Sequence, residues 1–273
     1  GRIGMVMRKI NTEIATLDDL GLPPILKDLS LEKRGLIIVV GATGSGKSTS
    51  MAGMVDHRNK LLAGHIITIE DPVEYVHRHH KSIVTQREVG MDTLSWHAAL
   101  KSAMREAPDV VIVGEVRDEE SMSRAMELAQ TGHLCMCTLH ATNANQAIER
   151  VINFYDEARH AQIFMDLALN LKSIISQRLV LKKDGTGRTV AMDILLNNPA
   201  VQGAFMTNPR WTGVFPAITT KFHADESIDA EGTIRHIDFQ IRNGIKISLR
   251  RNGKEDFDFV KLVDFDRPEN NTF

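Results

Sequence analysis

Short apolar runs alternate with longer amphipathic segments along most of the chain. The apolar runs are rich in Val and Ile and predict buried strands at residues 35–40, 65–69, 109–115 and 133–139. The segments between these runs, with their cap and stop residues, predict helices at residues 48–62, 93–106, 118–132, 143–153 and 160–176. Asp92 or Thr93 is the expected cap of the second of these helices, and Asp118 that of the third. This alternation implies an α/β fold with a mostly parallel sheet and helices on both faces.

The two ends of the chain differ from this pattern. Residues 1–10 predict a short strand, and Thr16 followed by Pro23 and Pro24 predicts a cap, a break and then a short helix. Residues 178–182 and 188–195 predict a hairpin around Asp184 and Gly185. Farther on, residues 233–241 and 246–250 are strand-like but have no partners to bury against, so we expect a small hairpin or a loose segment there.

Composition excludes several classes of protein. The chain has 273 residues, a formal net charge of -2 and 25% charged residues, so no basic excess points to nucleic acid. No apolar run approaches the roughly 18 to 20 residues that span a bilayer, and we expect a cytosolic protein without membrane insertion. Cys135 and Cys137 lie in an apolar run and are expected to fill the core.

The segment GATGSGKST carries the most specific chemistry. It fits the phosphate-loop pattern and lies between a predicted strand and a predicted helix, which argues against a chance match in a glycine turn. Lys47 is expected to reach the β and γ phosphates of ATP, and the Ser48 hydroxyl to bind Mg²⁺. The expected nucleotide cradle consists of Gly41, Ala42, Thr43, Gly44, Ser45, Gly46, Lys47, Ser48 and Thr49.

Polar residues follow three of the predicted strands. Glu70, Glu115 and His140 come at the carboxyl ends of these strands, which share one edge of a parallel sheet with the phosphate loop. ATP hydrolysis needs an acid near Mg²⁺ and a group that orients water. A single polar residue at a strand end is more often an ordinary surface residue, but two glutamates and a histidine beside a phosphate loop favour a functional site.

Five motifs together resemble those of secretion ATPases. They are GATGSGKST, TIEDPVEY, QREVG, MREAPDVVIVGEVRD and TGHLCMCTLHATNA. Together, these five segments look like the four motifs called Walker A, Asp-box, Walker B and His-box, in the family's order. Within that superfamily the chain is most similar to type IV pilus retraction ATPases of the PilT/PilU type, with residues 56–90 closest to the PilU branch. The resemblance covers about residues 3–200 and implies a RecA-like P-loop NTPase that works as a hexameric motor.

The resemblance also implies roles for individual residues. Glu70 and Glu115 take the roles of catalytic acids, with Lys47 beside them and with Ser48 and Glu115 on the metal side. His133 and His140 belong to the nucleotide-sensing box. Arginines near the nucleotide are Arg8, Arg105 and Arg117.

The resemblance further implies a division of the chain. Residues 1–20 are expected to be the remnant of an amino-terminal PAS-like domain with its linker, residues 21–200 the RecA-like ATPase domain, and residues 201–273 an unrelated tail. Residues 206–246 resemble the start of an aldolase, and residues 255–273 resemble a type I restriction subunit fragment. No four-cysteine module follows Gln177-Arg178-Leu179, which favours the retraction branch over extension ATPases.

The leading hypothesis is an ATP-hydrolysing motor subunit that drives type IV pilus retraction and twitching motility. The family implies a homo-hexamer or a mixed hexamer with a related ATPase, and an inner-membrane pilus platform protein as partner. The expected location is cytoplasmic, peripheral at the pilus base. Two alternatives stay open: an accessory nucleotide-binding subunit with little hydrolysis of its own, and a non-functional chimera.

Overall fold

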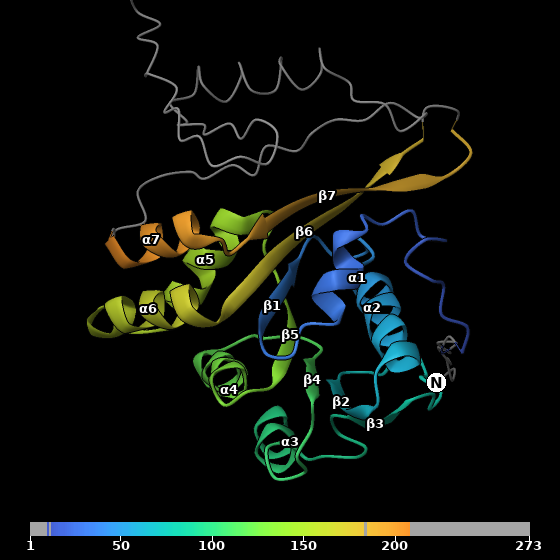
Figure 1. Ribbon diagram of the computed structural model, residues 1–273, viewed down its shortest axis with the longest axis horizontal. Helices are drawn as coiled ribbons and strands as arrows, with labels where there is room; N and C mark the ends of the chain where they lie inside the picture. The colour runs from blue at the N-terminus through green and yellow to red at the C-terminus, as the bar shows by residue number, and fades with distance from the viewer. Residues whose placement is uncertain (1–9, 11, 183–184, 208–273) are drawn as a thin grey trace, which may run out of the picture. The chain divides into compact units, whose positions relative to one another are not determined.

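A seven-stranded sheet forms the centre of the computed structural model, which describes residues 10, 12–182 and 185–207 (Figure 1). The strand order is β3-β2-β4-β5-β1-β6-β7, and all neighbours are parallel except β6 and β7. The strands are β1 (Gly35–Val40), β2 (Gly64–Glu70), β3 (Ser82–Glu88), β4 (Val110–Val113), β5 (Leu134–Leu139), β6 (Leu171–Leu181) and β7 (Arg188–Leu196). The predicted α/β class with a mostly parallel sheet is confirmed.

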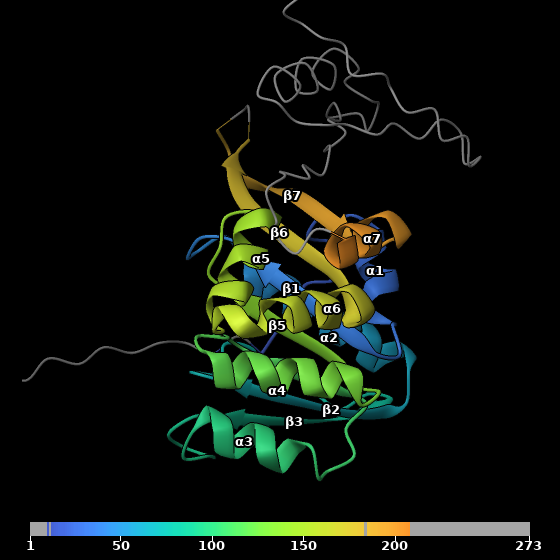
Figure 2. The same cartoon turned by 90° about the vertical axis from the view of Figure 1, so that its left-hand side faces the viewer.

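Helices cover both faces of this sheet (Figures 1 and 2). They are α1 (Ile25–Ser30), α2 (Lys47–Leu61), α3 (Trp96–Ala103), α4 (Glu119–Gln130), α5 (Ala144–Asn153), α6 (His160–Asn170) and α7 (Pro199–Thr207), with a 3-10 turn at Glu157–Arg159. The helices α1 and α2 lie on one face, and α3, α4 and α6 lie on the other. Within the described residues, no helix is long and apolar enough to cross a membrane.

The central strands are buried on both faces, as their continuous apolar sequences require. Every residue of β1 and β5 is buried. Ile37 and Val39 pack with Met54 of α2, while the alternate residues face the other helical layer. Cys135 and Cys137 are fully buried, and burial raises the pKa of the Cys137 thiol to about 12. Both cysteines are core residues, as predicted.

The helix predicted at 160–176 is wrong in its second half. It ends at Asn170, and β6 begins at Leu171 and pairs with β1. The side-chain amide of Asn197 donates to the carbonyl oxygens of Ala168 and Leu171 at 2.9 and 2.8 Å, so a residue distant in sequence caps the helix. The hairpin prediction is confirmed, with strands longer than expected because β6 starts earlier.

Two other elements differ from the sequence pattern. The edge strand β3 was not predicted, because Gln86, Arg87 and Glu88 make up its polar second half. The helix α3 is shorter than expected and is capped by Ser95, whose hydroxyl accepts from the Ala98 amide at 3.1 Å. Asp92 instead accepts from the Glu88 amide at 2.8 Å, so it caps no helix.

The helix α7 crosses position 200, where the family resemblance was expected to end. Phe205 is only 1% exposed, and its ring centroid lies 6.2 Å from that of Phe164 on α6. The packed unit therefore includes residues through Thr207. Several predictions lie outside the described residues. They are the strand expected at 1–10 except for Ile10, the site residue Arg8, the turn residue Asp184, and the tail from residue 208.

Candidate active site

The phosphate loop joins the end of β1 to the start of α2. Gly41, Gly44 and Gly46 have φ values of 151, 74 and 88°, which residues other than glycine rarely adopt. A Cβ atom on Gly41 would also collide with the Gln177 carbonyl oxygen and the Ser45 hydroxyl. Backbone conformation therefore favours glycine at all three positions, and close packing also requires it at Gly41.

Lys47 is the first residue of α2 and bends back over the loop. Its ammonium donates to the carbonyl oxygens of Gly41 and Ala42 at 2.7 and 3.1 Å. Burial lowers the pKa of Lys47, and the nearby charges of Glu115 and Glu74 oppose this shift. No side chain in the described part of the protein caps the amino end of α2, so the first amides of this helix are available to an anion.

Glu115 follows β4 and is held by two basic side chains. His140 Nε2 lies 2.6 Å from one carboxylate oxygen, and the Arg117 guanidinium lies 2.6 Å from the other. The hydrogen bond to Glu115 raises the pKa of Arg117. The amide of Val116 donates to the Thr138 carbonyl at 2.9 Å, which ties this segment to β5. The structure thus brings Glu115, Arg117 and His140 together near Lys47.

Glu70 ends β2 in a different environment. It accepts hydrogen bonds from the Thr68 hydroxyl at 2.6 Å and from the Gln86 amide at 3.3 Å. Burial raises the pKa of Glu70, and these hydrogen bonds oppose the shift. Gln86 also donates to the Tyr75 carbonyl at 2.8 Å, so it orients both Glu70 and the segment that follows. Nothing in the sequence pattern singled out the role of Gln86, although it lies in the QREVG motif.

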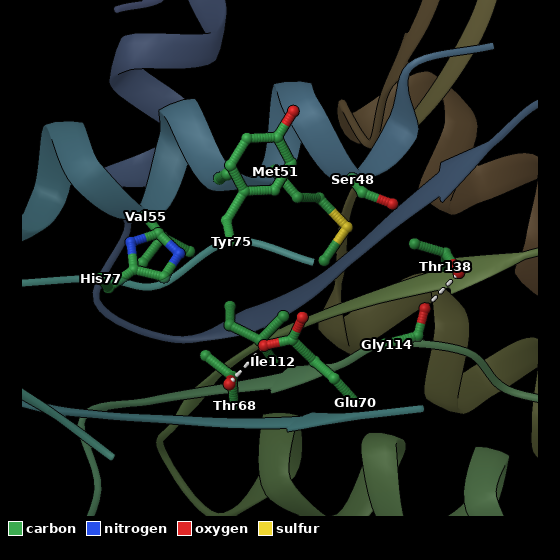
Figure 3. A pocket seen from close by; sticks show the side chains of 11 residues that line it. Ser48, Met51, Val55, Thr68, Glu70, Tyr75, His77, Ile112, Gly114 and Thr138 are labelled. Atoms are coloured by element: carbon green, nitrogen blue, oxygen red, sulfur yellow. Dashed lines mark hydrogen bonds between the residues drawn. The ribbon is translucent and has the colours of Figure 1, made fainter. Parts of the chain in front are cut away.

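A pocket lies between Glu70 and the start of α2 (Figure 3). Ser48 and Met51 of α2 line one side of it, and Glu70 with Thr68 lines the other. Its remaining lining residues are Ala52, Val55, Tyr75, His77, Ile112, Gly114 and Thr138. The Tyr75 hydroxyl lies 2.8 Å from that of Thr49, which links the segment after β2 to the phosphate loop.

Two predicted site residues lie away from this edge. His133 immediately precedes β5, and His140 immediately follows it, so about 20 Å of strand separates them. The His133 ring contacts Thr131 and the Leu128 carbonyl oxygen. Arg105 is exposed and precedes β4, whereas Glu115 follows it. Within one chain, neither His133 nor Arg105 joins the phosphate loop, contrary to expectation.

The donors present fit Mg²⁺ bound together with a nucleotide. The described residues contain no group of three or more His, Cys, Asp or Glu side chains that could hold a metal ion by themselves. Mg²⁺ usually keeps several waters and takes one or two protein ligands plus phosphate oxygens. The Ser48 hydroxyl lines the pocket, and Glu115 lies near enough to Lys47 to influence its pKa, so these two are the protein groups that would hold the ion.

A glycine-rich loop between a buried parallel strand and a helix, with acids at neighbouring strand ends, defines the P-loop nucleotide-binding class. The sequence model of one family, described as type II/IV secretion system protein, matches residues 4–258. The chain belongs to this family.

Individual relatives narrow the similarity. The chain is 59% identical to the type IV pilus ATPase PilU of Pseudomonas aeruginosa over 197 residues, which are 72% of this chain and 52% of that protein. It is 45% identical to the type IV pilus retraction ATPase PilT of the same organism, covering 73% of this chain and 58% of that protein. The chain therefore spans little more than half the length of these relatives.

Solved structures agree with this assignment. The pilus retraction motor PilT with bound ADP superimposes with a TM-score of 0.72 at 46% identity, covering 74% of this chain and 58% of that one. The ATPase DotB of Yersinia pseudotuberculosis gives a TM-score of 0.69 at 31% identity, covering 74% and 53%.

Proposed function

We propose that this chain is an ATP-hydrolysing motor subunit of the type IV pilus machinery. The observation that carries the proposal is the convergence of Lys47 of the phosphate loop with Glu115, which His140 and Arg117 orient. The similarity to PilT with bound ADP supports a nucleotide in this loop.

Each residue has a distinct role in the proposed hydrolysis. The loop amides and Lys47 bind the β and γ phosphates. Ser48 and Glu115 would hold Mg²⁺, which would supply positive charge beside the phosphates. Glu70 borders the same pocket and is placed to accept a proton from an attacking water. Arg117 and His140 keep the Glu115 carboxylate in one orientation.

The similarity to PilU and PilT extends the proposal to pilus retraction and twitching motility. The assembly would be a homo-hexamer, or a mixed hexamer with a related ATPase. We further propose that it acts at the cytoplasmic side of the inner membrane, on the platform protein at the pilus base. The retained Glu70 and Glu115 favour a hydrolysing subunit over a purely accessory nucleotide binder.

Two variants test the proposal. Lys47→Ala should weaken ATP binding at least about tenfold because it removes the loop's cation. Glu115→Gln should reduce turnover on the order of a hundredfold while ATP affinity stays within a few-fold. Phosphate release and binding of a fluorescent ATP analogue measure the two effects, and Lys101→Ala on the exposed face of α3 serves as control.

Three results would contradict parts of this assignment. If Lys47→Ala binds ATP with unchanged affinity, the phosphate-loop assignment is wrong. Equal activity of Glu115→Gln and the unaltered chain would make Glu115 structural. An unaltered chain that binds ATP but releases no phosphate at any concentration would identify the accessory subunit instead.

A further inference from the structure

Gln177 lies in the middle of β6, the strand beside β1, and is only 1% exposed. Its side-chain amide donates to the Ser45 carbonyl oxygen at 2.8 Å, and its side-chain oxygen accepts from the Ser50 hydroxyl at 2.8 Å. Ser45 belongs to the phosphate loop, and Ser50 lies in the first turns of α2. One buried side chain therefore bridges the loop and the helix that follows it.

The two hydrogen bonds fix which way the Gln177 amide points. A carbonyl oxygen can only accept, so the NH₂ group must face Ser45 and the oxygen must face Ser50. The contact is close on both sides of the loop. A Cβ atom on Gly46 would lie 2.8 Å from Gln177 Nε2, and one on Gly41 would collide with the Gln177 carbonyl oxygen.

The bond to Ser45 has a consequence for the next peptide group. In a trans peptide the carbonyl and the N–H of the following residue point in opposite directions. When Gln177 holds the Ser45 carbonyl toward β6, the Gly46 N–H points away from β6. That amide immediately precedes Lys47 and belongs to the set that phosphate loops direct at phosphate oxygens.

We propose that Gln177 is a positioning residue for nucleotide binding, which sets the direction of the Gly46 amide by holding the Ser45 carbonyl. This inference rests on the proposed function of the same loop. The ligand group that this amide binds is the diphosphate part of a nucleotide, because Gln177 fixes the Gly46 N–H whether or not a γ phosphate is present. The effect therefore belongs to ground-state binding, and the chemical step is little affected.

Variants of Gln177 separate the two hydrogen bonds. Gln177→Glu keeps an acceptor for Ser50 but places an acceptor against the Ser45 carbonyl. Ser50→Ala removes only the other bond. Ser173→Ala is the matched control, because Ser173 is fully buried on the same strand, two alternations earlier, and its hydroxyl has no hydrogen-bond partner within the described residues.

The test measures the dissociation constant of a fluorescent ADP analogue, and kcat and KM for ATP, on the full chain. Gln177→Glu should weaken ADP binding at least about tenfold, with kcat at saturating ATP within about threefold of the unaltered chain. Ser50→Ala should weaken ADP binding by no more than about threefold, and Ser173→Ala should leave it unchanged.

Folding is checked by circular dichroism and by Tm without nucleotide. If Gln177→Glu does not fold, Gln177→Met, of similar length and without charge, carries the same thresholds. A folded Gln177 variant with normal ADP affinity beside a functional unaltered chain would overturn this inference alone. A loss of kcat equal to the loss of affinity would also overturn it. Failure of the unaltered chain to bind nucleotide would instead overturn the proposed function.

Discussion

At the scale of single residues, the two acids of the site have different neighbours. Glu115 lies against Arg117 and His140. Among the described residues, the donors to Glu70 are uncharged, and its burial raises its pKa. A buried carboxyl with a raised pKa is a better proton acceptor near neutral pH than a free one. This difference favours Glu70 as the base and Glu115 as the acid on the metal side.

The pH dependence of turnover tests the role of Glu70. As the pH falls through its raised pKa, Glu70 takes up a proton, so kcat should decline at a higher pH than an ordinary glutamate would give. Glu70→Gln should lower kcat on the order of a hundredfold and abolish this acid limb. Steady-state phosphate release between pH 5 and 8 measures both, with Glu127→Gln on α4 as control. An acid limb that persists in Glu70→Gln would assign it to another group.

Asp193 on β7 offers a second test at this scale, one of stability. Burial raises its pKa from 3.8 to about 6, opposed by Arg178, and one carboxylate oxygen has no hydrogen-bond partner among the described residues. The pKa of Asp193 is higher in the folded state than in the unfolded state. The stability associated with its protonated form is therefore fully present below about pH 4 and is lost as the pH rises through about 6.

Asp193→Asn should remove this dependence. In urea titrations it should raise the unfolding free energy by about 1–2 kcal/mol at pH 8, a figure reduced for the partial exposure of the side chain. At pH 4 the gain should vanish. Asp156→Asn, at an exposed position, should show no such difference, and a gain of equal size at both pH values would exclude Asp193 titration as the cause.

At the scale of elements, burial decides which parts the sequence could predict. The strands β1, β4 and β5 are almost entirely apolar, and β2 has a buried centre. All four were predicted with boundaries close to those observed. The edge strand β3 has few buried positions, so it lacked that signal. The end of α6 was misplaced because tertiary contacts set it, through pairing with β1 and the distant Asn197.

The same distinction holds for the site. The loop, Glu70 and Glu115 follow from motif and strand order, whereas Gln86 and Gln177 act through side-chain contacts between strands and loops that no local pattern encodes.

Asn197→Ala tests the tertiary cap on α6. It removes the donors to the Ala168 and Leu171 carbonyl oxygens, so the unfolding free energy should fall by about 1–3 kcal/mol. Asn153→Ala, at the exposed end of α5, should change it by less than about 0.5 kcal/mol. Hydrogen exchange at the end of α6 should rise only in the Asn197 variant. Equal stability of the two variants would show that the capping bonds contribute little.

At the scale of the whole molecule, four basic residues expected at the site lie at opposite ends of the strands β4 and β5. Arg117 and His140 lie with the phosphate loop, whereas Arg105 and His133 lie before β4 and β5. The four residues of β4 separate Arg105 from the Glu115 edge by at least ~13 Å. If Arg105 stabilises the transition state, it must therefore act at the phosphate loop of a neighbouring subunit.

A mixing experiment tests this arrangement. Lys47→Ala subunits lack a working loop, and Arg105→Ala subunits lack the arginine, so each alone should hydrolyse ATP on the order of a hundredfold more slowly than the unaltered chain. When the two are mixed, interfaces that combine an intact loop from one variant with an intact Arg105 from the other should recover activity. Specific activity of the unaltered chain should also rise with protein concentration. If the mixture is no more active than the sum of its parts while sizing shows mixed assemblies, Arg105 does not act across an interface.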